Sequence, residues 1–266
     1  MKIIISGASG LVGMALTKNL RAEGHTVTHL VRVGRKTASS AGGEINWDPT
    51  SAYVDVPALE GADVVVHLSG ASVAGSRWTQ GRKQVLRSSR LDTTRILVDS
   101  LARLNPKPGV FICASAVGFY GNRGDEFLSE SSVAGTDFLA LLARDWEAEA
   151  IRAQTNAGIR TVILRFGVVF SNAGGALSKM VAPFKLGAGG PLGNGRQWQS
   201  WIALEDVLGI IRFAIANPDV GGPVNVVSPN PVRNAEFAQT LGKVLHRPAI
   251  FPAPAFALRL APQDLR

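Results

Sequence analysis

The chain has 266 residues, of which 46% are hydrophobic and 18% are charged, and its formal net charge is +8. This balance excludes a disordered chain and leaves room for one α/β domain with a deep core. The basic residues are scattered and no aromatic ladder runs between them, so we expect no nucleic-acid binding.

Cys113 is the one cysteine, which excludes an intramolecular disulfide, and its apolar neighbours favour an inert core thiol. No apolar run approaches the ~20 residues of a membrane helix, and the first residues do not resemble a signal peptide. We therefore expect a cytoplasmic protein with no membrane partner.

Short apolar runs alternate with longer segments of helical periodicity from the first residue onward. We expect strands at residues 2–6, 26–31, 63–68, 110–114 and 161–164, and helices at residues 11–23, 82–104 and 136–156. The strand segments are apolar almost throughout, which is typical of a parallel sheet buried on both faces. The alternation predicts an α/β fold, a Rossmann-like doubly wound parallel sheet with right-handed crossovers.

The last third of the chain is rich in glycine at first and proline-rich at its end. We expect a helix at residues 204–217, a strand at 223–227 and a helix at 234–245. We predict one domain over residues 1–266, in which residues 171–266 contribute most of a small C-terminal substrate-side subdomain. Residues 187–201 combine glycines with Trp198 and Trp201, which suits either a lid over a substrate or a packed hairpin.

A glycine-rich turn, Gly7-Ala8-Ser9-Gly10-Leu11-Val12-Gly13, follows the first strand directly and opens the first helix. Gly7 permits a tight turn, Gly10 lets the backbone approach a pyrophosphate, and Gly13 lets the helix pack close to the strand. Free amides at the helix N-terminus then face the phosphates. The pattern predicts a dinucleotide site, with an ordinary strand, turn and helix as the alternative.

Basic residues stand where an NAD-binding chain would carry an acid, about 20 residues after the turn. Val31 and Arg32 end the second strand, and Arg35 and Lys36 follow. A 2′-phosphate would meet positive charge and a stacking guanidinium here, which predicts NADP(H). The alternative is a solvated basic loop. Asp48 either approaches the adenine or stabilises a turn.

Further motifs lie at the ends of later strands and in the helices. They are Leu68-Ser69-Gly70, Ser115-Ala116-Val117-Gly118-Phe119-Tyr120-Gly121, Trp47-Asp48-Pro49, Ser89-Arg90, and residues 144–150, 174–177 and 193–197. Together they resemble the extended and atypical short-chain dehydrogenase/reductases, in particular the NAD-dependent epimerase/dehydratase-like proteins labelled cell-division-inhibitor homologues. The resemblance covers nearly the whole chain. That family usually continues beyond the point where this sequence ends, so we expect part of its C-terminal cover to be absent.

The resemblance implies a set of residues that bind NADP(H): Gly7, Ser9, Gly10, Leu11, Val12, Gly13, Val31, Arg32, Leu68, Ser69, Arg90 and Val168. Arg90 would reach in from the long helix, although a solvated helix residue is the alternative. Val168 would lie near the nicotinamide.

The tyrosine and lysine that the superfamily uses for acid–base catalysis are absent as a pair. Four residues after Tyr53 and Tyr120 stand Pro57 and Gly124 instead of lysine. Without a neighbouring cation, a tyrosine titrates near about 10 and is a poor base at neutral pH. We name Ser115 and Tyr120 as catalytic candidates, with a capped strand end and a packed ring as the alternatives.

Four other polar residues have a functional and a structural interpretation. Glu130 and Lys179 are either functional or surface charges, and Asp206 fits the first turn of a helix. His67 has no His or Cys at metal-ligand spacing, so we expect a structural histidine and no metal site.

We predict an NADP(H)-dependent oxidoreductase or nucleotide-sugar epimerase-like enzyme that acts on a small polar substrate. Because the tyrosine and lysine pair is absent, the alternative is an NADP(H)-binding regulatory or scaffold protein without turnover. The expected partner is a small molecule, and a homodimer is left open.

Overall fold

The computed structural model describes residues 1–34, 43–74 and 76–250. Its main sheet has eight strands: β1 (Lys2–Ser6), β2 (Thr26–Arg32), β3 (Glu44–Asp48), β4 (Tyr53–Val54), β5 (Val64–His67), β6 (Val110–Ala116), β7 (Arg160–Phe166) and β12 (Gly222–Val226). Their order is β12-β7-β6-β5-β1-β2-β3-β4, and every neighbouring pair is parallel except β3 and β4. This arrangement confirms the predicted doubly wound, Rossmann-like α/β fold.

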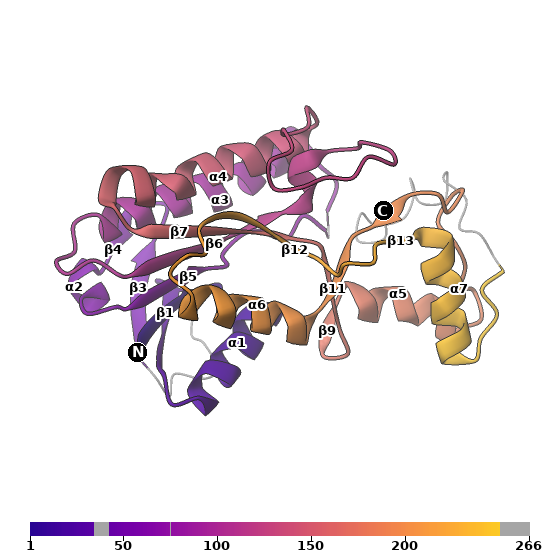
Figure 1. Ribbon diagram of the computed structural model, residues 1–266, viewed down its shortest axis with the longest axis horizontal. Helices are drawn as coiled ribbons and strands as arrows, with labels where there is room; N and C mark the ends of the chain where they lie inside the picture. Colours follow the sequence, from indigo (N-terminus) through magenta and orange to yellow (C-terminus); the bar gives the residue numbers. More distant parts are fainter. Residues whose placement is uncertain (35–42, 75, 251–266) are drawn as a thin grey trace.

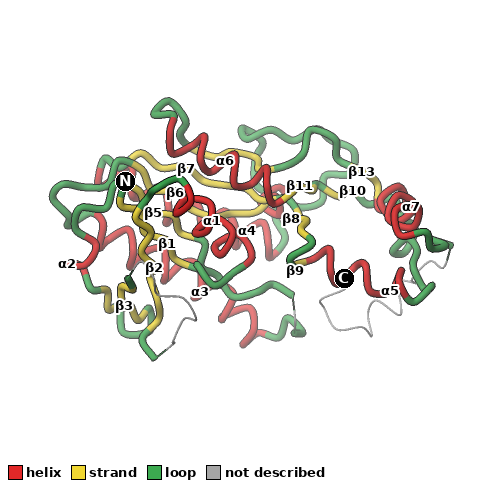
Figure 2. The backbone as a smooth tube through the Cα atoms, turned by 90° about the horizontal axis from the view of Figure 1, so that it is seen from below, coloured by secondary structure: helices red, strands yellow, loops and turns green. Residues whose placement is uncertain are grey.

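Helices cover both faces of this sheet (Figure 1). On one face lie α1 (Leu11–Ala22) and α6 (Leu204–Ala216), and on the other lie α3 (Gln80–Leu101) and α4 (Phe138–Ala157). Figure 2, seen from below, shows α1 and α6 in front of the central strands. The short helix α2 (Val56–Leu59) and the 3-10 helix η1 (Val117–Tyr120) lie in connections between strands and helices.

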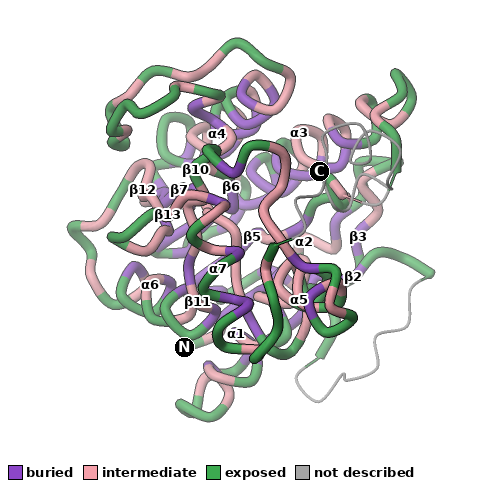
Figure 3. The backbone as a smooth tube through the Cα atoms, turned by 90° about the vertical axis from the view of Figure 1, so that its right-hand side faces the viewer, coloured by how far each residue is buried: buried purple, intermediate pink, exposed green. Residues whose placement is uncertain are grey.

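The alternation of side chains along β1 explains why both faces carry helices. Ile3 and Ile5 pack with Leu16 of α1, whereas Ile4 packs with Leu97 of α3. All three isoleucines are fully buried, as the apolar strand runs predict. Figure 3 shows that the central strands are mostly buried and that the outer loops are exposed.

The two long helices on the second face begin at side-chain caps. The Thr79 hydroxyl accepts a hydrogen bond from the Arg82 amide at the start of α3. The Asp137 carboxylate accepts hydrogen bonds from two amides in the first turn of α4. α4 ends at Gly158, whose φ of +68° is left-handed.

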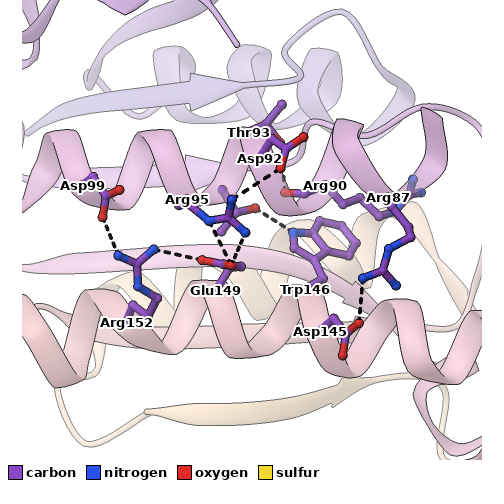
Figure 4. A network of polar contacts seen from close by, with 11 residues as sticks. Arg87, Arg90, Asp92, Thr93, Arg95, Asp99, Asp145, Trp146, Glu149 and Arg152 are labelled. Atoms are coloured by element: carbon purple, nitrogen blue, oxygen red, sulfur yellow. Dashed lines mark hydrogen bonds and ion pairs between the residues drawn. The ribbon is translucent and has the colours of Figure 1, made fainter. Parts of the chain in front are cut away.

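Ion pairs join the partly exposed sides of α3 and α4 (Figure 4). Arg87 pairs with Asp145 at 3.0 Å, and Arg95 pairs with Glu149 at 2.6 Å. Partly exposed pairs of this kind contribute about 0–1 kcal/mol each. These ion pairs therefore place opposite charges of α3 and α4 next to each other, but they add little to the stability of the fold.

A smaller part of the chain lies beyond the carboxyl ends of the main strands, at the right of Figure 1. It contains α5 (Ala176–Lys185), α7 (Asn234–Leu245), a three-stranded sheet of β8 (Val168–Ser171), β9 (Gly174–Gly175) and β11 (Trp201–Ala203), and a two-stranded sheet of β10 (Trp198–Gln199) and β13 (Val232–Arg233). Phe184, Ala238 and Leu241 form its apolar cluster. Trp198 and Trp201 lie in strands of the two small sheets, so the segment predicted as a lid or hairpin is built into them.

Within the described ranges, no helix is both long and apolar enough to cross a membrane. The same residues hold no group of three or more side chains arranged to bind a metal ion.

Candidate functional site

The predicted glycine turn connects β1 to α1 at the carboxyl end of the sheet. Gly7 has a φ of +74°, and a Cβ there would lie 2.7 Å from the Leu68 carbonyl carbon. A Cβ on Gly13 would lie 2.7 Å from the Ala8 Cα, so the first turn of α1 packs directly on the turn backbone. Only glycine fits at either position without moving the backbone. The left-handed φ of Gly7 agrees with the predicted tight turn, and the contact at Gly13 agrees with the predicted close packing of the helix.

The N-terminus of α1 is open. Gly10 occupies the N-cap, no side chain caps the helix, and its first turn holds no acidic residue. Ser9 and Gly10 are exposed, and Leu11 and Val12 are half-buried. The first amides of a helix have no partner within it and carry the positive end of the helix dipole. Such a terminus can bind an anionic group.

The carboxyl end of β2 lies next to β1 and carries the predicted cation. Val31 is buried and Arg32 is exposed. Among the described residues, none forms a hydrogen bond or an ion pair with the Arg32 side chain. Arg35 and Lys36, also predicted here, lie outside the described residues.

The chain leaves β5 through Leu68 and Ser69, beside the glycine turn. The Leu68 amide donates to the Ser6 carbonyl at 3.1 Å, and Ser69 is buried. Arg90 reaches the same segment from α3, and a Cβ on Gly70 would lie 3.3 Å from its Cζ. The structure thus brings Leu68, Ser69 and Arg90 together next to the turn.

Val168 begins β8, beyond the carboxyl end of β7, and its amide donates to the Ser200 carbonyl at 2.8 Å. The ribbon of β8 and β9 approaches α1, since a Cβ on Gly175 would lie 2.9 Å from Leu11 Cδ2. Val168 therefore lies at the same edge of the main sheet as the other predicted cofactor residues.

Three neighbouring strands carry a row of polar side chains near their carboxyl ends. Arg165 of β7 lies opposite Ser115 of β6 and Asn225 of β12 in the strand register. Glu147 of α4 covers this row: it accepts a hydrogen bond from Ser115 Oγ at 2.5 Å and one from Arg165 Nη2 at 2.8 Å. Ser115 and Arg165 are 4% and 3% exposed, so the row is a buried network.

Tyr120 joins the row from η1. Its hydroxyl accepts a hydrogen bond from Arg165 Nη1 at 2.9 Å and donates one to Asn225 Oδ1 at 2.5 Å. Burial opposes the charge of Arg165, but its hydrogen bonds with Glu147 and Tyr120 outweigh burial and raise the pKa of Arg165. From the sequence, we assumed that no cation neighbours a tyrosine. That assumption was wrong for Tyr120, because the cation comes from a strand 45 residues further along the chain.

The two catalytic candidates therefore lie in one network, and both of their hydroxyls have protein partners. The catalytic role of Ser115 and Tyr120 stays a prediction. Sequence reasoning missed Glu147, Arg165 and Asn225. Arg165 could have been found from the sequence, because it is a lone arginine near the end of the apolar run 161–166.

Glu130 has a structural role in the same region. Its Oε1 accepts a hydrogen bond from the Asn225 amide at 2.8 Å, and its carbonyl oxygen accepts one from Arg165 Nη1 at 3.0 Å. Glu130 thereby fastens the loop after η1 to β12, an outer strand of the sheet. Asp206 lies in the first turn of α6, as predicted, and Lys179 lies on α5.

His67 is fully buried and bonded, as expected for a structural histidine. Its Nδ1 lies 2.6 Å from Ser6 Oγ and its Nε2 lies 3.0 Å from Thr94 Oγ1. Burial lowers the pKa of His67 to about 3, so the ring is neutral.

Asp48 stabilises a turn. It accepts hydrogen bonds from Thr50 Oγ1 at 2.7 Å and Ser51 Oγ at 2.8 Å, and the bonds with Thr50 hold the pKa of Asp48 below its usual range.

A cavity of about 430 Å³ lies between the loop after η1 and the smaller C-terminal part. Its lining residues are Asp125, Asn194, Gly195, Arg196, Arg233 and Ala235. Arg233 pairs with Asp125 at 2.6 Å and lies over the Trp198 ring, with Cζ 3.9 Å from the centroid. A polar ligand would meet charges of both signs there.

A model of the NAD dependent epimerase/dehydratase family matches residues 3–228. The chain belongs to this family. Epimerase family protein Mb2239 of Mycobacterium bovis is 46% identical over 259 residues, which are 97% of this chain and 84% of that protein. Epimerase family protein YfhF of Bacillus subtilis is 40% identical over 262 residues, which are 98% of this chain and 85% of that protein.

A solved structure is similar to this epimerase-family chain over its whole length. Human epimerase family protein SDR39U1 (isoform 2), crystallised with NADPH, is 33% identical, with a TM-score of 0.87 and coverage of 100% of this chain and 87% of that one. The resemblance found in the sequence motifs is therefore confirmed, together with the fold.

Proposed function

We propose that the protein is an NADP(H)-dependent oxidoreductase or nucleotide-sugar epimerase-like enzyme that acts on a small polar substrate. The observation that carries the proposal is the open N-terminus of α1 within the glycine turn, with Arg32 exposed at the end of the adjacent strand. The human relative crystallised with NADPH supports the choice of cofactor class.

The residues present fit a dinucleotide. Gly10 at the N-cap has no side chain that could cap the first amides of α1, and a pyrophosphate is the anion that such a turn accepts. Arg32 would hold the 2′-phosphate, which distinguishes NADP(H) from NAD(H). When bound, the nicotinamide supplies or accepts the hydride.

The substrate would enter from the side of the smaller C-terminal part. Five of the six residues that line the 430 Å³ cavity belong to residues 171–266, which supports the proposal that these residues form a substrate-side lobe. The guanidinium groups of Arg196 and Arg233 would orient anionic or hydroxyl-rich groups. A small polar substrate suits this lining.

Ser115 and Tyr120 are the proposed catalytic residues. Arg165 lies within hydrogen-bond distance of Tyr120, so the network contains a cation beside a phenol despite the missing lysine. Glu147 would hold both Ser115 and Arg165 in place. We expect Ser115→Ala and Tyr120→Phe to slow NADPH oxidation with carbonyl substrates while leaving NADPH binding unchanged.

The cofactor is tested by thermal shift with NADPH, NADP, NADH and NAD in parallel. We expect larger shifts with the phosphorylated pair and loss of that preference in Arg32→Asp. Arg103→Asp, an arginine after the far end of α3, is the matched charge control. Equal shifts with NADH and NADPH in the wild-type protein would refute the role of Arg32. Absence of any shift, supported by calorimetry, would refute the proposal.

A second candidate function is an NADP(H)-binding regulator without turnover. The observation that favours it is that the Ser115 and Tyr120 hydroxyls both have partners inside the protein. A regulator would bind NADPH tightly, oxidise no NADPH with any carbonyl substrate tried, and change its affinity for a partner on binding. Turnover that depends on Tyr120 would exclude it.

A further inference from the structure

Arg82 and Arg90 differ from the other arginines of α3. Arg87 and Arg95 pair with acids on α4, as Figure 4 shows. Across the part of the chain that the structure describes, no ion pair joins Arg82 or Arg90 to a carboxylate. Among the described residues, both guanidinium groups donate only to backbone carbonyl oxygens.

The carbonyl oxygens that they bind are consecutive. Arg90 Nη1 donates to Ala71 O at 3.0 Å, and Arg82 Nη2 donates to Ser72 O. The two positive charges, about two helical turns apart in sequence, are thus brought together beneath residues 68–72. Ser89 fastens the same segment, because its Oγ accepts a hydrogen bond from the Ala71 amide at 3.1 Å.

Within residues 1–34, 43–74 and 76–250, the pair is partly buried and has no carboxylate partner, although the Arg90 guanidinium lies 5.1 Å from the centroid of the Trp146 ring. Burial, followed by the charge of Arg82, lowers the pKa of Arg90 to about 10. Arg82 Nε is buried and has no hydrogen-bond partner among the described residues. Buried cations are normally paired with an anion, because burying an unpaired charge is costly. A ligand that brings negative charge would remove this cost.

The free donors suit an oxyanion. A guanidinium has five N–H donors in a planar fork, and the hydrogen bonds to described residues use one nitrogen of each arginine. The remaining donors match the oxygens of a phosphate. The location of the two arginines also favours a phosphate ligand, because residues 68 and 69, which lie next to them, contact Gly7 of the glycine turn.

We propose that Arg82 and Arg90 form one oxyanion site that binds a phosphate group. The proposal deepens the function proposed above and rests on it only for the source of the phosphate, which is either NADP(H) or a phosphorylated substrate. Nothing in the family match or in the glycine turn assigns Arg82 to a ligand.

Inorganic pyrophosphate is the probe, and its affinity for the full chain is measured by isothermal titration calorimetry. Loss of one charge-assisted hydrogen-bonding partner should weaken binding about 10- to 100-fold in Arg82→Gln and in Arg90→Gln. Arg103→Gln, which removes the same charge after the far end of α3, should stay within about twofold of the wild-type protein. Pyrophosphate affinity that is unchanged in both test variants would overturn the proposal.

A repeat with NADPH-saturated protein identifies the source of the phosphate. If NADPH abolishes pyrophosphate binding, and if both variants also weaken NADPH binding, the site serves the cofactor. If pyrophosphate still binds, and the variants still weaken it, the site serves a phosphorylated substrate. Either result supports the site.

A purely structural role predicts a different pattern. If the arginines only fasten residues 68–72, the variants will melt earlier but bind pyrophosphate as tightly as the wild-type protein while folded. Arg90→Lys, which keeps the charge, replaces Arg90→Gln should the latter not fold. If the wild-type protein binds no NADPH but binds pyrophosphate through Arg82 and Arg90, the proposed function fails and this site stands.

Discussion

Replacing Glu147 with glutamine should destabilise the protein strongly. The change keeps the shape of the side chain but leaves Arg165 without the carboxylate that it pairs with at 2.8 Å. The side chains of Arg165 and Glu147 are only 4% and 10% exposed, so water does not screen the lost charge. Removing one partner of a buried ion pair costs about 3–5 kcal/mol. That is a large fraction of the roughly 5–15 kcal/mol that stabilises a typical folded protein.

Urea denaturation measures this loss as a lower midpoint with an unchanged slope. Glu126→Gln is the matched control, because Glu126 pairs with Arg123 at 2.6 Å but the two side chains are 48% and 30% exposed. We expect the control to lose less than about 1 kcal/mol. The double variant Glu147→Leu/Arg165→Met buries no charge and should lose less stability than Glu147→Gln alone. Equal losses in Glu147→Gln and Glu126→Gln would refute the reasoning.

Three further predictions follow from single sites. Gly13→Ala should lower the free energy of unfolding by about 1–3 kcal/mol, because its methyl would lie 2.7 Å from Ala8 Cα. Gly10→Ala should lower it by less than about 1 kcal/mol, because the nearest atom to its methyl would be 3.3 Å away. Urea denaturation curves that rank the two variants the other way would contradict this. His67 has a pKa of about 3 when folded but 6.5 in an unfolded chain, so the unfolded chain binds the extra proton and stability should fall, by up to about 1.4 kcal/mol per pH unit, as pH drops below 6.5. His67→Gln should flatten this dependence, and an unchanged slope would show that another group causes it. The Cys113 thiol is buried, which raises its pKa, so Ellman's reagent should label it only after unfolding; rapid labelling of the native protein would disprove its burial.

Local patterns were enough to predict most of the main sheet and the glycine turn. The strands β1, β5 and β6 are apolar almost throughout, and a turn that needs glycine for close contact shows in the sequence directly. β3 was missed although Ile45 and Trp47 alternate with exposed residues, because polar residues interrupt its apolar ones and a polar stretch of sequence precedes it.

The row of polar side chains on β6, β7 and β12 could not be predicted from local sequence patterns. Ser115, Arg165 and Asn225 come from strands that are far apart in the sequence, and only the register of the folded sheet places them opposite one another. Ser115 and Tyr120 were found because they follow a strand in a familiar motif. Their partners were not, because Arg165 lies 45 residues after Tyr120 and no local spacing links the two.

The hydrogen bond from the Asn225 amide to Glu130 has a consequence for self-association. An outer strand with free amides invites another chain to extend the sheet. Here one of those amides already has an acceptor, held by a loop anchored to Arg165. Two copies joining through β12 would have to expel that carboxylate, so this edge is protected against intermolecular strand addition.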